Sequence, residues 1–276
     1  MSLPPLLKKT YVLPMEGGLG AQILTKITGE YIRDSGIEVI YDMEYFNQPP
    51  TVGTPQTGVS IWEYGLDYYN IARDEFTGLT ARAQWALKSL KWLTRKRLSD
   101  RYLFDGRPKR MSLLREALSR QDYGYLFPIH ERTQQQIHAL TGGDRSFGVA
   151  HLRRGDYLNV ASHIIGDANV IALLRQRATL PATIFVISDG TPDAAQWRQG
   201  LPNTQIHFFK SDDIYLCHGL MRTAALLVTA NSQFSYTAAI LQTDLSAETF
   251  VPANWLAPGN AVNSYMHLKP GWNSYY

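Results

Sequence analysis

The sequence predicts an α/β protein with parallel β-sheets, and three observations support this prediction. An apolar segment at 10–15 is followed by a glycine-rich turn, a segment with helical spacing at 21–35 and a strand-like segment at 38–42. A second alternation of the same kind starts near residue 146. The segment 182–188 within it is a clear strand that ends in Asp-Gly. A strand-loop-helix-strand order predicts that the strands pair in parallel.

The chain is long enough for two domains. It has 276 residues, and domains commonly hold about 100–200 residues. The sequence Leu-Thr-Gly-Gly-Asp at 140–144 indicates a break between the two α/β segments. We therefore predict an N-terminal α/β domain at 1–145, with a helical insertion, and a C-terminal α/β domain at 146–276.

In the N-terminal domain, the predicted strand 10–15 leads through a loop at 16–20 into a helix that Gly36 ends. Residues 47–60 are rich in Pro, Gly and Thr and predict a long loop. Residues 80–120 are predicted to be helical and basic. A solvated helical face is the favoured interpretation, and attraction to phosphate-bearing lipid or glycan is the alternative.

In the C-terminal domain, alternating strands and helices are predicted. The predicted strands are 146–152, 182–188, 205–209 and 227–230, and the predicted helices are 169–179, 220–226 and 234–241.

Composition excludes several classes of protein. Hydrophobic residues make up 45% and charged residues 18%, which is typical of a globular protein. The net charge of +3 is too small for a dedicated nucleic-acid binder. Cys217 is the single cysteine, so a disulfide framework is excluded and a cytoplasmic location is predicted, with peripheral contact to the inner membrane as an option. The histidines have no zinc spacing, and neither a Gly-x-Ser-x-Gly elbow nor a DxD motif is present.

The first motif is Gly17-Gly18-Leu19-Gly20-Ala21-Gln22, between a predicted strand and a predicted helix. Glycines at this position let a backbone approach a ligand, and a helix N-terminus favours an anion. The motif lacks the third glycine of the dinucleotide fingerprint and the Gly-Lys of a P-loop. A tight turn that needs glycine is the equally good alternative.

The second motif is His151-Leu152-Arg153-Arg154-Gly155-Asp156-Tyr157, at the end of a predicted strand. Ligands of open α/β sheets bind at the carboxyl ends of strands. Two arginines beside a glycine there match the oxygens of a diphosphate and would stabilise its charge without a metal. The alternative is a surface arginine pair with Asp156 as its salt-bridge partner.

Two further motifs follow later strands. Ala230-Asn231-Ser232-Gln233-Phe234-Ser235-Tyr236 opens a predicted helix, so hydroxyl and backbone N–H groups converge there, and helix capping by Ser232 is the simpler interpretation. Asp189 follows the strand 182–188 and is suited to ribose hydroxyls or a guanine edge, or to a turn.

Together, the motifs at 17–22, 151–157 and 230–236 resemble those of the α-1,2-fucosyltransferases of glycosyltransferase family 11. The resemblance implies a GT-B fold, in which two Rossmann-like domains face a cleft. It also implies an inverting, metal-independent transfer of fucose from GDP-fucose to a sugar hydroxyl, in surface polysaccharide biosynthesis. By this resemblance the C-terminal domain holds the donor and the N-terminal domain the acceptor glycan. Arg153 and Arg154 would bind the pyrophosphate, and the nucleotide site would be lined by His151, Asp189, Asn231, Ser232 and Ser235.

The chain departs from the family pattern at two places. Ala21 replaces the asparagine of the glycine-rich motif, and Tyr236-Thr237 replaces a Trp-Trp pair. Another nucleotide sugar, or a non-catalytic glycan- or nucleotide-binding module, are therefore the alternatives to fucose transfer. A single displacement needs a base, and Asp156 and Glu16 are the carboxylates beside the motifs. The acceptor, the linkage and the oligomeric state are left open by the sequence.

Overall fold

The computed structural model describes residues 10–47, 62–73, 107–120, 122–155, 164–210, 212–244, 246–255 and 271–276. The chain divides into two compact units, Met1–Gln121 and Asp122–Tyr276, and each is described by itself. The division places residues 122–145 in the second unit, whereas the boundary predicted from the sequence lies at 145/146. The reason is helix α4 (Glu131–Thr141), whose Ile137 belongs to a core cluster of the second unit. The Gly142-Gly143 pair ends this helix with φ angles of 63° and 83°.

The first unit contains a parallel β-α-β segment, as predicted. Strand β1 (Thr10–Pro14) pairs with β2 (Glu38–Asp42), and α1 (Leu19–Asp34) connects them. The helix begins two residues earlier than predicted because Gly18 serves as its N-cap. Gly29 packs so closely on Tyr41 that an added Cβ atom would overlap the tyrosine hydroxyl.

Shorter helical segments complete the described part of the first unit. They are two 3-10 turns, at Glu44–Asn47 and Leu66–Tyr69, and helix α3 (Arg107–Arg120). The guanidinium of Arg120 lies 5.4 Å from the centre of the Tyr31 ring, which joins α3 to α1. Helix α3 confirms the prediction for the end of the segment 80–120. Residues 80–106 and nearly all of the predicted loop 47–60 lie outside the described residues.

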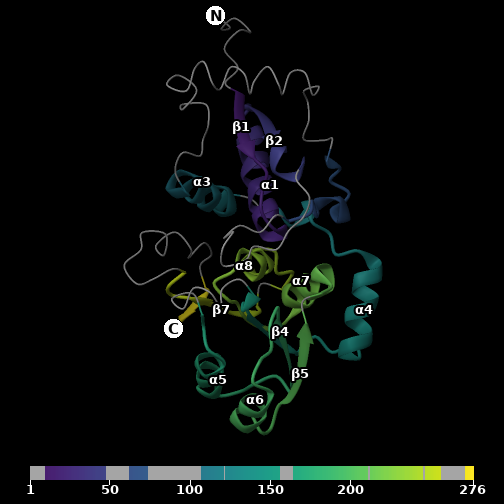
Figure 1. Ribbon diagram of the computed structural model, residues 1–276, viewed down its shortest axis with the longest axis vertical. Coiled ribbons are helices and arrows are strands. Elements are labelled where there is room, and N and C mark those ends of the chain that lie inside the picture. The colour runs from purple at the N-terminus through teal and green to yellow at the C-terminus, as the bar shows by residue number, and fades with distance from the viewer. Residues whose placement is uncertain are drawn as a thin grey trace, which may run out of the picture. The chain divides into compact units, whose positions relative to one another are not determined.

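The second unit is built on a six-stranded parallel sheet (Figure 1). The strand order is β5-β4-β3-β6-β7-β8. The strands are β3 (Gly148–Leu152), β4 (Thr183–Ser188), β5 (Gln205–Lys210), β6 (Leu226–Val228), β7 (Glu248–Pro252) and β8 (Asn273–Tyr275). The chain moves outward from β3 to β5, then returns to the centre and moves outward on the other side from β6. This is the doubly wound order of the Rossmann fold, and its switch point lies between β3 and β6.

Helices cover both faces of this sheet. Alternate residues of β3 belong to two separate cores: Ala150 and Leu152 pack with residues of α5 (Asp167–Arg175) and α6 (Ala194–Gly200). Val149 packs with residues of α4, α7 (Ile214–Thr223) and α8 (Gln233–Ile240). The predicted α/β class is therefore confirmed. That two such domains face each other across a cleft stays a prediction.

Helix α7 differs most from its predicted bounds of 220–226. It begins at Ile214 because the carboxylate of Asp213 caps it, accepting hydrogen bonds from the backbone N–H groups of Tyr215 (3.2 Å) and Leu216 (2.9 Å). The chain leaves the helix after Thr223 and enters β6 at Leu226. Within the described ranges, no helix is both long enough and apolar enough to cross a bilayer.

Candidate functional site at the carboxyl edge of the second sheet

The switch point of the second sheet brings the later motifs onto one edge. Strands β3, β4 and β6 run in parallel, and in register Leu152 pairs with Ser188 while Ala150 pairs with Val228. The segments that follow these three strands therefore leave the sheet at the same edge, which is where ligands of doubly wound sheets bind. They carry the predicted site residues Arg153, Arg154, Asp189, Asn231, Ser232 and Ser235, and His151 is the penultimate residue of β3 before them.

Asp189 connects the ends of β3 and β4. Its Oδ1 accepts a hydrogen bond from the backbone N–H of Arg154 at 2.6 Å, and its Oδ2 lies 2.6 Å from Nη1 of Arg153. A Cβ atom at Gly155 would lie 2.6 Å from Asp189 Oδ2, and one at Gly190 would lie 2.6 Å from the Cβ of Arg154. The glycines of both motifs thus allow the two loops to touch. The Arg153 and Asp189 side chains each remain 18% exposed, so this ion pair is in reach of a ligand.

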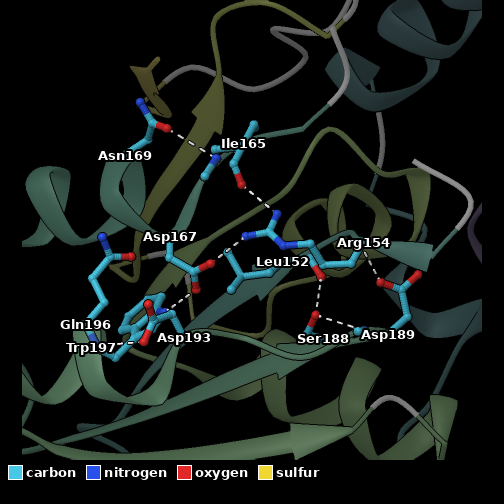
Figure 2. A network of polar contacts seen from close by, with 12 residues as sticks. Leu152, Arg154, Ile165, Asp167, Asn169, Ser188, Asp189, Asp193, Gln196 and Trp197 are labelled. Carbon is cyan, nitrogen blue, oxygen red and sulfur yellow. Dashed lines mark hydrogen bonds and ion pairs between the residues drawn. The ribbon is translucent and has the colours of Figure 1, made fainter. Parts of the chain in front are cut away.

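The side chain of Arg154 points the other way, into the unit (Figure 2). Its Nη1 donates to the carbonyl oxygen of Ile165 at 2.6 Å, and its Nη2 pairs with Oδ2 of Asp167 at 2.9 Å. The other oxygen of Asp167 accepts from the indole N–H of Trp197 at 2.5 Å. The Arg154 side chain is only 7% exposed. Arg153 and Arg154, predicted together as pyrophosphate ligands, therefore occupy different environments: Arg153 lies at the edge, and Arg154 anchors the loop.

His151 is the one residue of β3 with a polar side chain. It is buried, and its ring lies 5.7 Å from that of Phe234. Its Nδ1 has no hydrogen-bond partner within the part of the chain that the structure describes. Burial, with the charges of Arg153 and Arg154, lowers its pKa to about 3, so the ring is neutral. Because buried polar atoms nearly always have a partner, an unpartnered one at this edge of the sheet is a candidate contact for a ligand or an ordered water.

The segment after β6 is shaped by its own side chains. Ser232 is the N-cap of α8, and its hydroxyl accepts from the backbone N–H of Phe234, as the capping interpretation predicts. The buried Ser235 hydroxyl accepts from the backbone N–H of Ala230 at 3.1 Å. The side-chain amide of Asn231 donates to the carbonyl of Trp255 at 3.2 Å. Ser232 and Ser235 therefore set the path of the loop, and Asn231 ties it to the segment that follows β7.

The glycine-rich motif lies in the first unit. Gly17 has a left-handed φ of 77°, and Gly20 is buried in the first turn of α1. Gln22 is fully buried: its Nε2 donates to the carbonyls of Gly17 (2.8 Å) and Glu63 (2.9 Å), and its Oε1 accepts from the backbone N–H of Gly65 (2.9 Å). Gln22 therefore holds the loop in place. Of the two predicted bases, Glu16 is exposed beside Gly17, and Asp156 lies outside the described residues.

Two residues of the anchor around Arg154 had no role in the sequence analysis. Asp167 lies 13 positions after Arg154, and Trp197 lies 30 positions after Asp167. The one local signal was an acid in the first turn of a helix that follows Gly166. Nothing near Trp197 in the sequence points to Asp167. In the described ranges, no group of three or more His, Cys, Asp or Glu side chains is placed to hold a metal ion.

The buried histidines make the second unit sensitive to acid. His218 of α7 is buried, with Nε2 3.2 Å from the Thr237 hydroxyl, and burial together with Arg222 lowers its pKa well below the usual 6.5. Unfolded chains bind the proton near pH 6.5, so stability is complete above that pH and is lost as the pH falls toward the folded pKa. We expect each of His151 and His218 to cost about 2 kcal/mol of unfolding free energy between pH 7 and pH 5.

Urea unfolding of the wild type at both pH values measures this loss, and His218→Gln should reduce it by about 2 kcal/mol, the share of one such histidine. His138→Gln, on the exposed side of α4, is the matched control. An unchanged pH dependence in His218→Gln would contradict a neutral buried imidazole.

Comparison with known proteins gives no match to a protein-family model and no match to a curated protein. Solved fucosyltransferase structures are similar to this chain. The structure of POFUT1 in complex with GDP-fucose has a TM-score of 0.44 at 13% identity, over 85% of this chain and 94% of that chain. The α-1,6-fucosyltransferase NodZ soaked with GDP-fucose has a TM-score of 0.45 at 14% identity, over 87% and 97%. NodZ from Bradyrhizobium has a TM-score of 0.41 at 15% identity, over 92% and 97%.

Proposed function

We propose that the chain is an inverting, metal-independent glycosyltransferase whose second unit binds a nucleoside diphosphate sugar. The observation that carries this proposal is the pair of groups at the switch point: Arg153 at the exposed edge and the buried, unpartnered Nδ1 of His151 two residues before it. A cation and an unsatisfied polar atom at the carboxyl edge of a doubly wound sheet fit a ligand with a diphosphate and a polar sugar or base.

The chemistry follows from where charge develops. When the bond between sugar and diphosphate breaks, negative charge grows on the leaving phosphate oxygens. A guanidinium fixed beside them stabilises this charge through two parallel N–H donors. Arg153 supplies that group, and Asp189 holds it in place before the ligand binds. Inversion requires a base for the acceptor hydroxyl, and we propose Asp156 or Glu16 for this step.

We propose GDP-fucose as the donor, on the resemblance of the three motifs, and a sugar hydroxyl of a surface polysaccharide as the acceptor. GDP-fucose is also the ligand named for POFUT1 and NodZ, which makes it the first donor to test. Its guanine base would need hydrogen-bonding partners. We propose Asp189 and Asn231 for this role, because a carboxylate and an amide can bond to the polar atoms of guanine.

The nucleotide can be identified by thermal unfolding. GDP at about 100 times its dissociation constant should stabilise the protein by about 2.7 kcal/mol, while UDP, dTDP and CMP at equal concentration should have little effect. Purified protein with GDP-fucose and a glycan mixture should then release GDP. Stabilisation by UDP or dTDP alone would mean that the donor is a different nucleotide sugar, and the proposal of a nucleotide-sugar site would stand. Stabilisation by none of the four would refute the proposal.

A further inference from the structure

An exposed tryptophan lies on the glycine-rich loop of the first unit. Trp62 is 40% exposed, the most of any tryptophan that the structure describes; Trp197 is fully buried and Trp255 is 9% exposed. A Cβ atom added to Gly18 would lie 3.5 Å from Cδ2 of Trp62 and 3.8 Å from both Cε2 and Cε3. These similar distances to three ring atoms show that the Gly18 backbone packs against a face of the indole. The absence of a side chain at Gly18 therefore lets the Trp62 ring pack directly on the backbone there.

The ring is held in place by the backbone on both sides. The backbone N–H of Trp62 donates to the hydroxyl of Tyr45 at 2.9 Å. The next residue, Glu63, has its carbonyl bonded to the buried Gln22, which also accepts from the N–H of Gly65. An exposed aromatic side chain on such a fixed segment is preorganised, because binding a ligand to it orders little additional chain.

Two exposed acidic residues lie on the chain segments that meet at Trp62. Glu16 and Glu63 are both exposed, and Glu63 directly follows Trp62. The Tyr45 hydroxyl, which contacts the Trp62 backbone, also accepts a hydrogen bond from the backbone of Gly17. Burial and then the negative charge of Glu16 raise the pKa of this hydroxyl. The segments that meet at this aromatic surface thus carry two exposed carboxylates.

This combination selects among ligands that bind to aromatic rings. A sugar ring has an apolar face of C–H groups and a rim of hydroxyl donors, so it fits an exposed indole on segments that also carry exposed carboxylates. A nucleotide could also stack on an indole, but two carboxylates would repel its phosphates. We propose that Trp62 and Glu16 form a subsite for a neutral sugar ring. On the function proposed above, this sugar belongs to the acceptor.

Binding of sugar to Trp62 can be measured without turnover. In protein labelled with ¹⁵N-tryptophan, Trp62→Phe identifies the indole N–H signal of Trp62 among those of the six tryptophans. Methyl β-galactoside, methyl β-glucoside, methyl N-acetyl-β-glucosaminide and lactose are the probes. We expect at least one of them to shift this signal saturably, and Trp62→Ala to weaken its binding roughly tenfold or more. Tyr125→Ala removes an aromatic side chain that is 65% exposed in the second unit, and it should not change this binding.

A Trp62 signal that no probe shifts, or equal affinity in wild type and Trp62→Ala, would overturn the subsite. In the transfer reaction, Trp62→Ala should raise KM for the acceptor more than KM for GDP-fucose, and Trp62→Phe should restore part of the loss. A loss confined to kcat would also count against the subsite. Failure of GDP to bind the wild type would refute the proposed transferase, and the sugar titration would still decide the subsite.

Discussion

Replacing Arg154 by alanine should lower the free energy of unfolding of the second unit by about 3–5 kcal/mol. The Arg154 guanidinium pairs with Asp167, and these side chains are only 7% and 14% exposed. Without the arginine, the carboxylate of Asp167 stays in this environment with no cation, and the carbonyl of Ile165 loses its donor. Loss of turnover in this variant would thus follow from loss of the fold around the site.

Urea unfolding followed by circular dichroism measures this loss, and a second substitution tests its cause. In Arg154→Met with Asp167→Asn, no buried charge remains, and the amide oxygen of the introduced asparagine can still accept from the indole of Trp197. We expect this pair to recover roughly 2 kcal/mol relative to Arg154→Met alone, as coupled neighbours do. Arg153→Ala is the matched control, since it removes the same residue type one position away. Equal stability of Arg154→Ala and wild type would contradict the anchor.

The parts of the fold that were predicted correctly have local signals. Strand β2 has the predicted bounds, and α1 begins within two residues of its predicted start, because Gly18 and Gly36 mark the ends of the helix. Helix α7 was predicted six residues too late, although its cap, Asp213, is a local signal. Strand β8 has three residues, and it is a strand only because it pairs with β7. Short elements of that kind depend on tertiary contacts that a sequence pattern does not record.

For the candidate site, the motif predicted the location but not the direction of its side chains. Arg153 and Arg154 lie after the end of β3, where the period of a strand no longer fixes which way a side chain points. Which one turns inward depends on Asp167, and through it on Trp197, residues that the fold brings to Arg154 from α5 and α6. The unpartnered Nδ1 of His151 is likewise a property of the packed unit, since it depends on what surrounds the ring.

Arg153→Ala should weaken GDP binding by about 10- to 150-fold, the range expected for losing a charge-assisted hydrogen bond. With GDP-fucose it should slow turnover at saturating donor by about 100- to 1000-fold, because the leaving diphosphate carries more charge in the transition state than in the ground state. The unfolding midpoint should change little, since the Arg153 side chain is 18% exposed and its ion pair with Asp189 lies at the edge of the sheet. Isothermal titration with GDP and single-turnover kinetics measure the two effects.

Arg153→Lys separates charge from geometry. Lysine keeps the positive charge but lacks the planar fork that contacts two phosphate oxygens, so it should recover part of the binding and less of the rate. Because Oδ2 of Asp189 lies 2.6 Å from Nη1 of Arg153, a diphosphate must share or replace this carboxylate as partner of the guanidinium. Because the wild type has this guanidinium contact to the diphosphate and Arg153→Ala lacks it, the GDP affinity of the wild type should fall more steeply with added salt. If Arg153→Ala binds GDP as the wild type does, the diphosphate does not bind at this edge through Arg153, and the division of roles between the two arginines is wrong.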